Sequence, residues 1–517
     1  MVEAVSISVF QDIQHRRSKM GYEFFDSDVT WRLDNSIKLN WGRLPKSVNE
    51  TFVNGYKKQM ADHAEELSAS HCSIIFEIIL SILRTQEANE LSLSTLQNYL
   101  STLDSSSEHK LGSIRAFLLN WIDKKIEGIS PEIESWLEQI TLKGMNKGVP
   151  VAKGCPHTGA YSMQEQEAVL RWGVNAFMAD KLSLRDYTWL MLNIYLGARP
   201  TQFCQLQAGD LRMKSRDGHT EYTLQLPHAK KRGVKNFRDY FKEVEIDEDL
   251  ALLISNQAQV TAKLIEEQVG ILTEKQKAVM PVFGALKKIR GLSSKGELDN
   301  LRLNTPDAIH FSRGYADTVL RNLTKICDAR SERLKGEFIH LTARRFRYTL
   351  GTNAARRGLS PFVIAKILGH SDIQNVKVYT ENVKELGEEI NEALAAVLAP
   401  LAQAFAGTLI SSEADAIRVN DPLSRIHNSH GDSLGNCGKY GFCSTGGRAC
   451  YTCAKFQPWV HGRHQVFLND LLEERKRLRD KGASSFVLQS TDRVVLAMQE
   501  VIILCEKAKR DVGLLDG

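Results

Sequence analysis

Apolar side chains recur at spacings of three and four residues over most of this chain, and this pattern limits its fold more than any other feature. The pattern begins near residue 57 and is typical of helices that bury one face. It is clearest at 74–80, 93–100, 111–122 and 133–140, which we expect to form a helical bundle. Only 12 of the 517 residues are proline, and a collagen-like or all-β fold is excluded. The sequence predicts a mainly α fold with a small β component (α+β).

Two segments interrupt the helical pattern and suggest domain boundaries. Residues 1–56 contain eight aromatic residues and short alternating runs such as 5–9, which favour strands. We expect a small N-terminal module there. Between 143 and 156, three glycines and two prolines indicate a linker. A chain of this length forms about three or four domains, and we divide it into 1–56, 57–150, 160–406 and 407–517.

Local signals predict one helix start and one hairpin. Ser162 and Glu165 have the spacing of a capping box, so we expect a helix to begin between them. The segments 221–226 and 240–246 alternate as strands do, and they flank the basic turn 230–235. The sequence therefore predicts a hairpin with a cationic tip.

The positive charge of the chain is concentrated in one short segment. Residues 341–380 have a net charge of +6, whereas the whole chain has +5. A solvated helix face is one explanation, and an anchor for a phosphate backbone is the other.

Within this basic segment an arginine, a Leu-Gly-His triplet and a tyrosine follow in order. Arg347 precedes His370 by 23 residues, and Tyr379 follows His370 by nine. Upstream, the turn Gly197-Ala198-Arg199 opens an expected helix that leads to Asp210. This order resembles the signature of tyrosine recombinases, the phage-integrase family of DNA strand-exchange enzymes, over roughly residues 60–400. It is most similar to integrases of transposons and genomic islands, which have a Cys-rich C-terminal extension.

The resemblance implies a site-specific recombinase or integrase of a mobile genetic element that acts in DNA integration and transposition. A helical core DNA-binding domain (57–150) and a catalytic domain (160–406) would clamp double-stranded DNA between them. Tyr379 would attack a scissile phosphate and form a 3′-phosphotyrosyl intermediate without a cofactor. The family also implies a transient tetramer on DNA, in which residues 391–406 dock on a neighbour, and accessory recombination proteins. Residues 1–56 would bind arm-type DNA or pack against the core.

The residue types suit this chemistry on physical grounds. Guanidinium groups bind phosphate oxygens in a bidentate manner, so Arg199 and Arg347 would hold the scissile phosphate and stabilise the forming phenolate. A tyrosine hydroxyl has a pKa of about 10 and needs such cations to act as a nucleophile. Lys230, with Lys231 as an alternative, would protonate the leaving 5′ oxygen. His370 would donate a hydrogen bond to the phosphate.

One position departs from the family pattern. Three residues before Arg347 the family usually has histidine, and this chain has Arg344. We expect Arg344 to bind the phosphate and the proton of Tyr379 to pass to solvent or to a phosphate oxygen. His340 lies one turn away from the expected place. The departure, with the Cys-rich module, motivates one alternative, a catalytically impaired DNA-binding or regulatory protein. A second alternative is an enzyme similar to a type IB topoisomerase or a hairpin resolvase, which shares the DNA clamp but rejoins differently.

Four cysteines within 17 residues form a second cluster: Cys437, Cys443, Cys450 and Cys453. Glycines separate them, and a terminal C-x2-C pair suits a tetrahedral thiolate site. We expect structural zinc, with an iron–sulfur cluster or four reduced structural cysteines as alternatives. Four thiolates leave no open coordination position, which argues against a zinc hydrolase. The module would contact DNA or a neighbouring subunit, and His461 and His464 are expected at its surface.

The cellular location of the protein is predicted from two signals that the sequence lacks, a secretory signal and a membrane span. The N-terminus lacks a charged segment followed by an apolar core, so no secretory signal is predicted. The apolar stretch 393–410 contains Pro400 and Gln403 and is expected to be a docking helix rather than a membrane span. We therefore expect a bacterial, cytoplasmic, nucleoid-associated protein without membrane contact.

Overall fold

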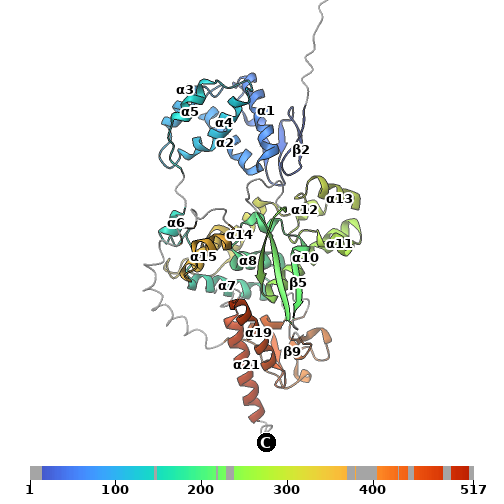
Figure 1. Cartoon of the computed structure of the whole chain (residues 1–517). Coiled ribbons are helices and arrows are strands. Elements are labelled where there is room, and N and C mark those ends of the chain that lie inside the picture. Colours follow the sequence, from blue (N-terminus) through green and yellow to red (C-terminus); the bar gives the residue numbers. More distant parts are fainter. Residues whose placement is uncertain are drawn as a thin grey trace, which may run out of the picture.

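The computed structural model of the chain describes residues 14–144, 148–216, 219–228, 238–369, 376, 379, 404–428, 430–440, 447–480 and 491–511. Figure 1 shows three stacked parts: a helical bundle with small sheets at the top, a central body, and the C-terminal segment below. The expected strand at 5–9 and the expected docking segment up to residue 403 lie outside the described residues.

The upper part combines two short β-pairs with a helical bundle. The strands β1 (His15–Arg17) and β2 (Glu23–Phe25) pair antiparallel, as do β3 (Thr30–Arg32) and β4 (Lys38–Asn40). The helices are α1 (Glu50–Glu66), α2 (Ala69–Thr85), α3 (Leu93–Ser101), α4 (His109–Asp123) and α5 (Glu132–Gln139).

The β-pairs and the bundle share one hydrophobic core. Trp41 is buried, and its ring centroid lies 5.0 Å from that of Tyr56 and 5.2 Å from that of Phe76. The helix α1 begins at Glu50, so it crosses the boundary that we predicted between residues 56 and 57. Asn49 caps it by accepting a hydrogen bond from the Thr51 amide. The division of the chain into domains stays a prediction.

A loop of the upper part contacts the central body. The Asn35 side chain, between β3 and β4, donates hydrogen bonds to the carbonyls of Asp307 (2.9 Å) and His310 (3.2 Å). These carbonyls precede α14 (Arg313–Ile326). The loop between β3 and β4 therefore connects the upper part to the central body.

The central body packs helices around α8 (Leu184–Leu196). Its other helices include α7 (Met163–Met178), α9 (Pro200–Cys204), α10 (Glu248–Val269), α13 (Lys295–Asn304), α15 (Ala343–Arg356) and α16 (Pro361–Leu368). Trp189, Leu190 and Leu192 of α8 are almost fully buried. The capping box predicted at Ser162 and Glu165 is present at the start of α7 and is confirmed.

One antiparallel sheet lies on this body, in the order β5–β6–β7. The strands are β5 (Leu211–Arg216), β6 (His219–Pro227) and β7 (Phe241–Ile246). The predicted hairpin is confirmed as β6 and β7, with Leu226 opposite Lys242. The strand β5 was not predicted, because its apolar alternation is limited to Leu211 and Met213 and the rest of the segment is polar.

The C-terminal part joins a three-stranded sheet to two helices. Its sheet has the order β10–β9–β8, from β8 (Arg425–His427), β9 (Ser433–Cys437) and β10 (Phe456–Pro458). The helices α19 (His464–Asp480) and α21 (Asp492–Asp511) pack against it, as Figure 1 shows. The predicted mainly α fold with small sheets is thus confirmed. No described helix is both long and apolar enough to cross a membrane.

Candidate active site

The C-terminal end of α16 gathers three cationic side chains from different parts of the sequence. The carbonyls of Ile367, Leu368 and Gly369 accept hydrogen bonds from Lys242, Arg347 and Arg199, respectively. The Lys242 Nζ–Ile367 O distance is 2.5 Å, and the Arg199 Nη1–Gly369 O distance is 3.3 Å. The last carbonyls of a helix lack partners within the helix and have partial negative charge. They therefore stabilise the clustered cations.

A left-handed glycine allows Arg199 to reach this place. Gly197 ends α8 with φ of +49°, and a Cβ there would lie 3.1 Å from the Phe346 carbonyl and 3.2 Å from the Arg347 Cα. Only glycine permits both this backbone conformation and this close approach of α15. The predicted Gly-x-Arg turn therefore brings Arg199 beside Arg347.

The two arginines affect each other and Tyr379 electrostatically. Burial, together with the charge of Arg199, lowers the pKa of Arg347 to about 10. Burial also lowers the pKa of Arg199, and Tyr379 opposes this shift. Two like charges close together in a half-buried site repel each other. This repulsion favours the binding of an anion between the two guanidinium groups.

Tyr379 is buried beside these arginines. It is 4% exposed, and burial raises the pKa of its phenol to about 12, although Arg347 and Arg199 both lower it. The Tyr348 ring centroid lies 6.4 Å from that of Tyr379. On α15 Gly351 faces the phenol ring, and the absence of a side chain there makes room for it. The structure thus brings together three of the predicted site residues: Arg199, Arg347 and Tyr379.

Two neighbouring arginines of α15 have different surroundings. Arg344 is exposed and lies one turn before Arg347, so both occupy one helix face. Arg345 is 1% exposed and forms an ion pair with Glu165 at 3.3 Å. Its guanidinium also lies 3.9 Å from the centroid of the Tyr161 ring. The basic segment 341–380 therefore includes one arginine, Arg345, whose charge is neutralised by Glu165 within the protein.

The remaining predicted residues of this site are outside the described part of the chain. They are His370, Lys230 and Lys231. Both ends of the hairpin that contains the two lysines are fixed near Arg199: Gln202 of α9 donates to the Pro227 carbonyl at 2.8 Å, and Arg238 forms a bidentate ion pair with Asp210. The side chain of His340 is exposed, and its backbone carbonyl accepts a hydrogen bond from Arg345.

The sequence reasoning missed Lys242. A signal was present, because Lys242, Val244 and Ile246 alternate along a predicted strand and therefore share one face. Ile246 is buried and Val244 packs against the core of the central body. A lysine on this inward face is unusual, and burial, Arg347 and Lys366 lower its pKa to about 8.

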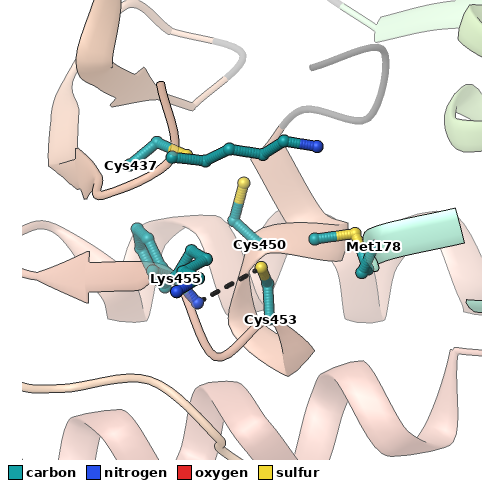
Figure 2. Close-up of a pocket in the computed structure, with 7 residues that line it drawn as sticks. Met178, Cys437, Cys450, Cys453 and Lys455 are labelled. Atoms are coloured by element: carbon teal, nitrogen blue, oxygen red, sulfur yellow. Dashed lines mark hydrogen bonds between the residues drawn. The ribbon is translucent and has the colours of Figure 1, made fainter. Parts of the chain in front are cut away.

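The cysteine cluster forms a separate site in the C-terminal part. Cys437, Cys450 and Cys453 line one pocket with Lys439, Lys455 and Met178 of α7. Figure 2 shows the three thiols directed toward a common region, with the Met178 sulfur beside it. The Lys455 amide donates to the Cys453 sulfur at 3.4 Å. Cys443 lies outside the described residues, and among those described no three potential ligands are placed to hold a metal ion.

His464 is buried, contrary to the expectation of a surface histidine. Its Nε2 donates to the Trp459 carbonyl at 2.9 Å, so Nδ1 accepts from the Tyr451 hydroxyl at 2.5 Å. Burial lowers the pKa of His464 and favours this neutral form. Both ring nitrogens of His464 therefore form hydrogen bonds within the C-terminal part. His461 is exposed, as expected.

The central part of the chain matches a known family. Residues 173–385 match the family model described as the phage integrase family. This range includes Arg199, Lys230, Arg347, His370 and Tyr379 and ends before the cysteine cluster. No curated protein matches the chain.

Several solved structures are similar to the chain at low sequence identity. The XerH site-specific recombinase bound to difH substrate is 14% identical, with a TM-score of 0.37, over 65% of this chain and 82% of that one. The XerA recombinase is 14% identical, with a TM-score of 0.29, over 67% and 98%. The Tn1549 transposon integrase in complex with circular intermediate DNA is 15% identical, with a TM-score of 0.32, over 62% and 85%.

Proposed function

We propose that the chain is a tyrosine-type site-specific recombinase, from the premise that residues 173–385 match the family model described as the phage integrase family. It cleaves and rejoins double-stranded DNA, as an integrase of a mobile genetic element does. The observation that supports this most strongly is the placement of Tyr379 beside Arg199 and Arg347, although these residues are distant in the sequence.

In the proposed cleavage step the Tyr379 oxygen attacks the phosphorus of a scissile phosphate. The bond from phosphorus to the 5′ oxygen breaks, and a 3′-phosphotyrosyl bond forms. The guanidinium groups of Arg199 and Arg347 stabilise the charge that develops on the phosphate oxygens. The phenol proton passes to solvent or to a phosphate oxygen. Rejoining reverses these steps with the 5′ hydroxyl of a partner strand.

Three further side chains complete the proposed site. Arg344 adds a third guanidinium from the same helix face as Arg347, and His370 donates a hydrogen bond to the phosphate. The leaving 5′ oxygen takes its proton from a lysine of the hairpin of β6 and β7, for which the sequence suggests Lys230 or Lys231. No metal or nucleotide takes part, because the cations of the chain supply the electrostatic stabilisation.

We also propose that the cysteine cluster binds structural zinc through Cys437, Cys443, Cys450 and Cys453. The pocket shared by three of these thiols supports this, as does the backbone N–H directed at the Cys453 sulfur, which is a common feature around metal thiolates. Zinc would stabilise the fold of a module whose core is small.

We further propose that four copies of the chain assemble into a transient tetramer on DNA and that accessory recombination proteins take part.

The test of the main proposal is covalent trapping. A DNA duplex of the element's ends, nicked near the crossover so that rejoining is prevented, is incubated with wild type, Tyr379→Phe and Tyr348→Phe. We expect a covalent protein–DNA band with wild type and with Tyr348→Phe, and no band with Tyr379→Phe. A protein that binds this duplex without any covalent band would instead be a DNA-binding regulatory protein.

A further inference from the structure

The end of α16 holds Lys242 in the same way as it holds the two arginines. Three consecutive carbonyls accept one hydrogen bond each from Lys242, Arg347 and Arg199. These cations come from β7, from α15 and from the residue that caps α9. The carbonyls that accept from Lys242 and Arg347 are adjacent in the chain, and the charge of Arg347 acts on the Lys242 ammonium.

The side chain of Lys242 reaches this place through the register of the sheet. Lys242 lies opposite Leu226 of β6, and Leu226 is 2% exposed. Four residues earlier, the ion pair of Arg238 with the buried Asp210 fixes the chain that enters β7. Lys242 is therefore fixed by strand pairing on one side and by an ion pair on the other.

The electrostatic surroundings of Lys242 favour the loss of its proton. Arg347 of α15 and Lys366 of α16 are the charged groups that act on it, and both are cationic. With burial, they lower its pKa to about 8. A proton donor is most effective when its pKa is near the working pH, which an unperturbed lysine at about 10.4 is not.

We propose that Lys242 is a further catalytic residue and that it, rather than Lys230 or Lys231, protonates the leaving 5′ oxygen. This assignment rests on the proposed recombinase function and specifies which hairpin lysine performs this step. As the bond between phosphorus and the 5′ oxygen breaks, a proton moves from Nζ to that oxygen and leaves a neutral amine. In rejoining, the amine takes the proton back as the 5′ hydroxyl attacks the phosphotyrosyl bond.

The test compares two substrates that differ only in the leaving atom. One nicked duplex has the normal 5′ oxygen at the scissile phosphate, and the other has sulfur there, which leaves as a thiolate without protonation. The variants are Lys242→Arg, which keeps the charge but donates a proton poorly, and Lys242→Met. Lys230→Ala and Lys231→Ala are the rival variants, and Lys214→Ala is the control, since Lys214 is an exposed lysine on β5 of the same sheet.

We expect Lys242→Arg and Lys242→Met to cleave the oxygen substrate at least about 100-fold more slowly than wild type, in the usual range for loss of a general acid. Both should cleave the sulfur substrate at nearly the wild-type rate, which also shows that they are folded. Equal losses on both substrates, or sulfur rescue confined to Lys230→Ala or Lys231→Ala, would overturn the assignment. If wild type formed no covalent product with either substrate, the proposed function would fail instead.

Discussion

Tyr379 packs against Gly351 so closely that a Cβ at position 351 would lie 2.6 Å from the Cε1 atom of the phenol ring. The ring belongs to the proposed nucleophile and the glycine to α15, the helix that also presents Arg347. The position of the phenol relative to the arginine therefore depends on the absence of one methyl group.

The first prediction follows from this contact. Gly351→Ala should displace the Tyr379 ring and reduce covalent trapping by about 100-fold, since a misplacement of about 1 Å can cost that much in rate. DNA affinity should change little, because the phosphate ligands remain. Gly314→Ala is the matched control, since a Cβ there meets nothing within 4 Å. Trapping at the wild-type level by Gly351→Ala would show that the ring is free to move.

A second prediction contrasts the neighbours Arg344 and Arg345. Arg345→Ala removes one of the two arginines that form ion pairs with the buried Glu165, and loss of one partner from a buried ion pair typically costs about 3–5 kcal/mol. We expect a loss of this size in the free energy of unfolding, measured with urea.

Arg344→Ala should leave that free energy within about 0.5 kcal/mol of wild type, because the side chain is exposed. Its effect should be on cleavage, which we expect to be slower by 10-fold or more in the trapping experiment. Unchanged cleavage would remove Arg344 from the proposed phosphate site.

The third prediction concerns pH. Lys242 donates a proton only while it is charged, and burial with Arg347 and Lys366 lowers its pKa to about 8. Single-turnover cleavage of the oxygen substrate at low DNA concentration should therefore fall about tenfold per pH unit above that value. With the sulfur substrate this fall should be absent. A fall that is equal for both substrates would point to a group that does not donate the proton.

The fourth prediction concerns the proposed zinc site. Treatment with a zinc chelator, or Cys437→Ser, should release zinc, measured by elemental analysis, and increase amide hydrogen exchange in residues 404–511. Exchange should also rise at the end of α7, because Met178 lines the cysteine pocket and Asp180 forms an ion pair with Lys439 at 2.7 Å.

Cys505→Ser provides the control for this experiment, since Cys505 is buried in the same module but lies outside the cysteine pocket. Its zinc content should match that of wild type. A purified protein that contains iron and sulfide in place of zinc would contradict the choice of metal but not the choice of ligands.

The sequence predicted the elements whose signals are local. The capping box at Ser162 needs only two residues at a fixed spacing, and the strands β6 and β7 alternate clearly. The start of α1 was placed too late, because its first turns contain aromatic residues that we assigned to the N-terminal module. Phe52 and Tyr56 instead belong to the core that the module shares with the bundle.

The surroundings of single charged residues were less predictable. Arg345 is neutralised by Glu165, which is 180 residues away in the sequence, and no local pattern reports such a pair. His464 follows the cysteine cluster like a surface residue, yet it packs between Tyr451 and Trp459. Arg199, Arg347 and Tyr379 could be grouped because their order and spacing resemble a family signature, whereas the carbonyls that hold the cations could not be predicted.

The choice of backbone carbonyls as partners for these cations has a consequence for the DNA-free protein. Side chains of Asp or Glu at the end of α16 would form full ion pairs with Lys242, Arg347 and Arg199, and a phosphate would have to compete with whole negative charges. Carbonyl dipoles bear only partial charge, so they keep mutually repelling cations together yet yield readily to an anion with a formal charge. In the proposed mechanism, the carbonyls of the helix end would therefore hold the three cations together until a phosphodiester binds, and they would compete with it only weakly.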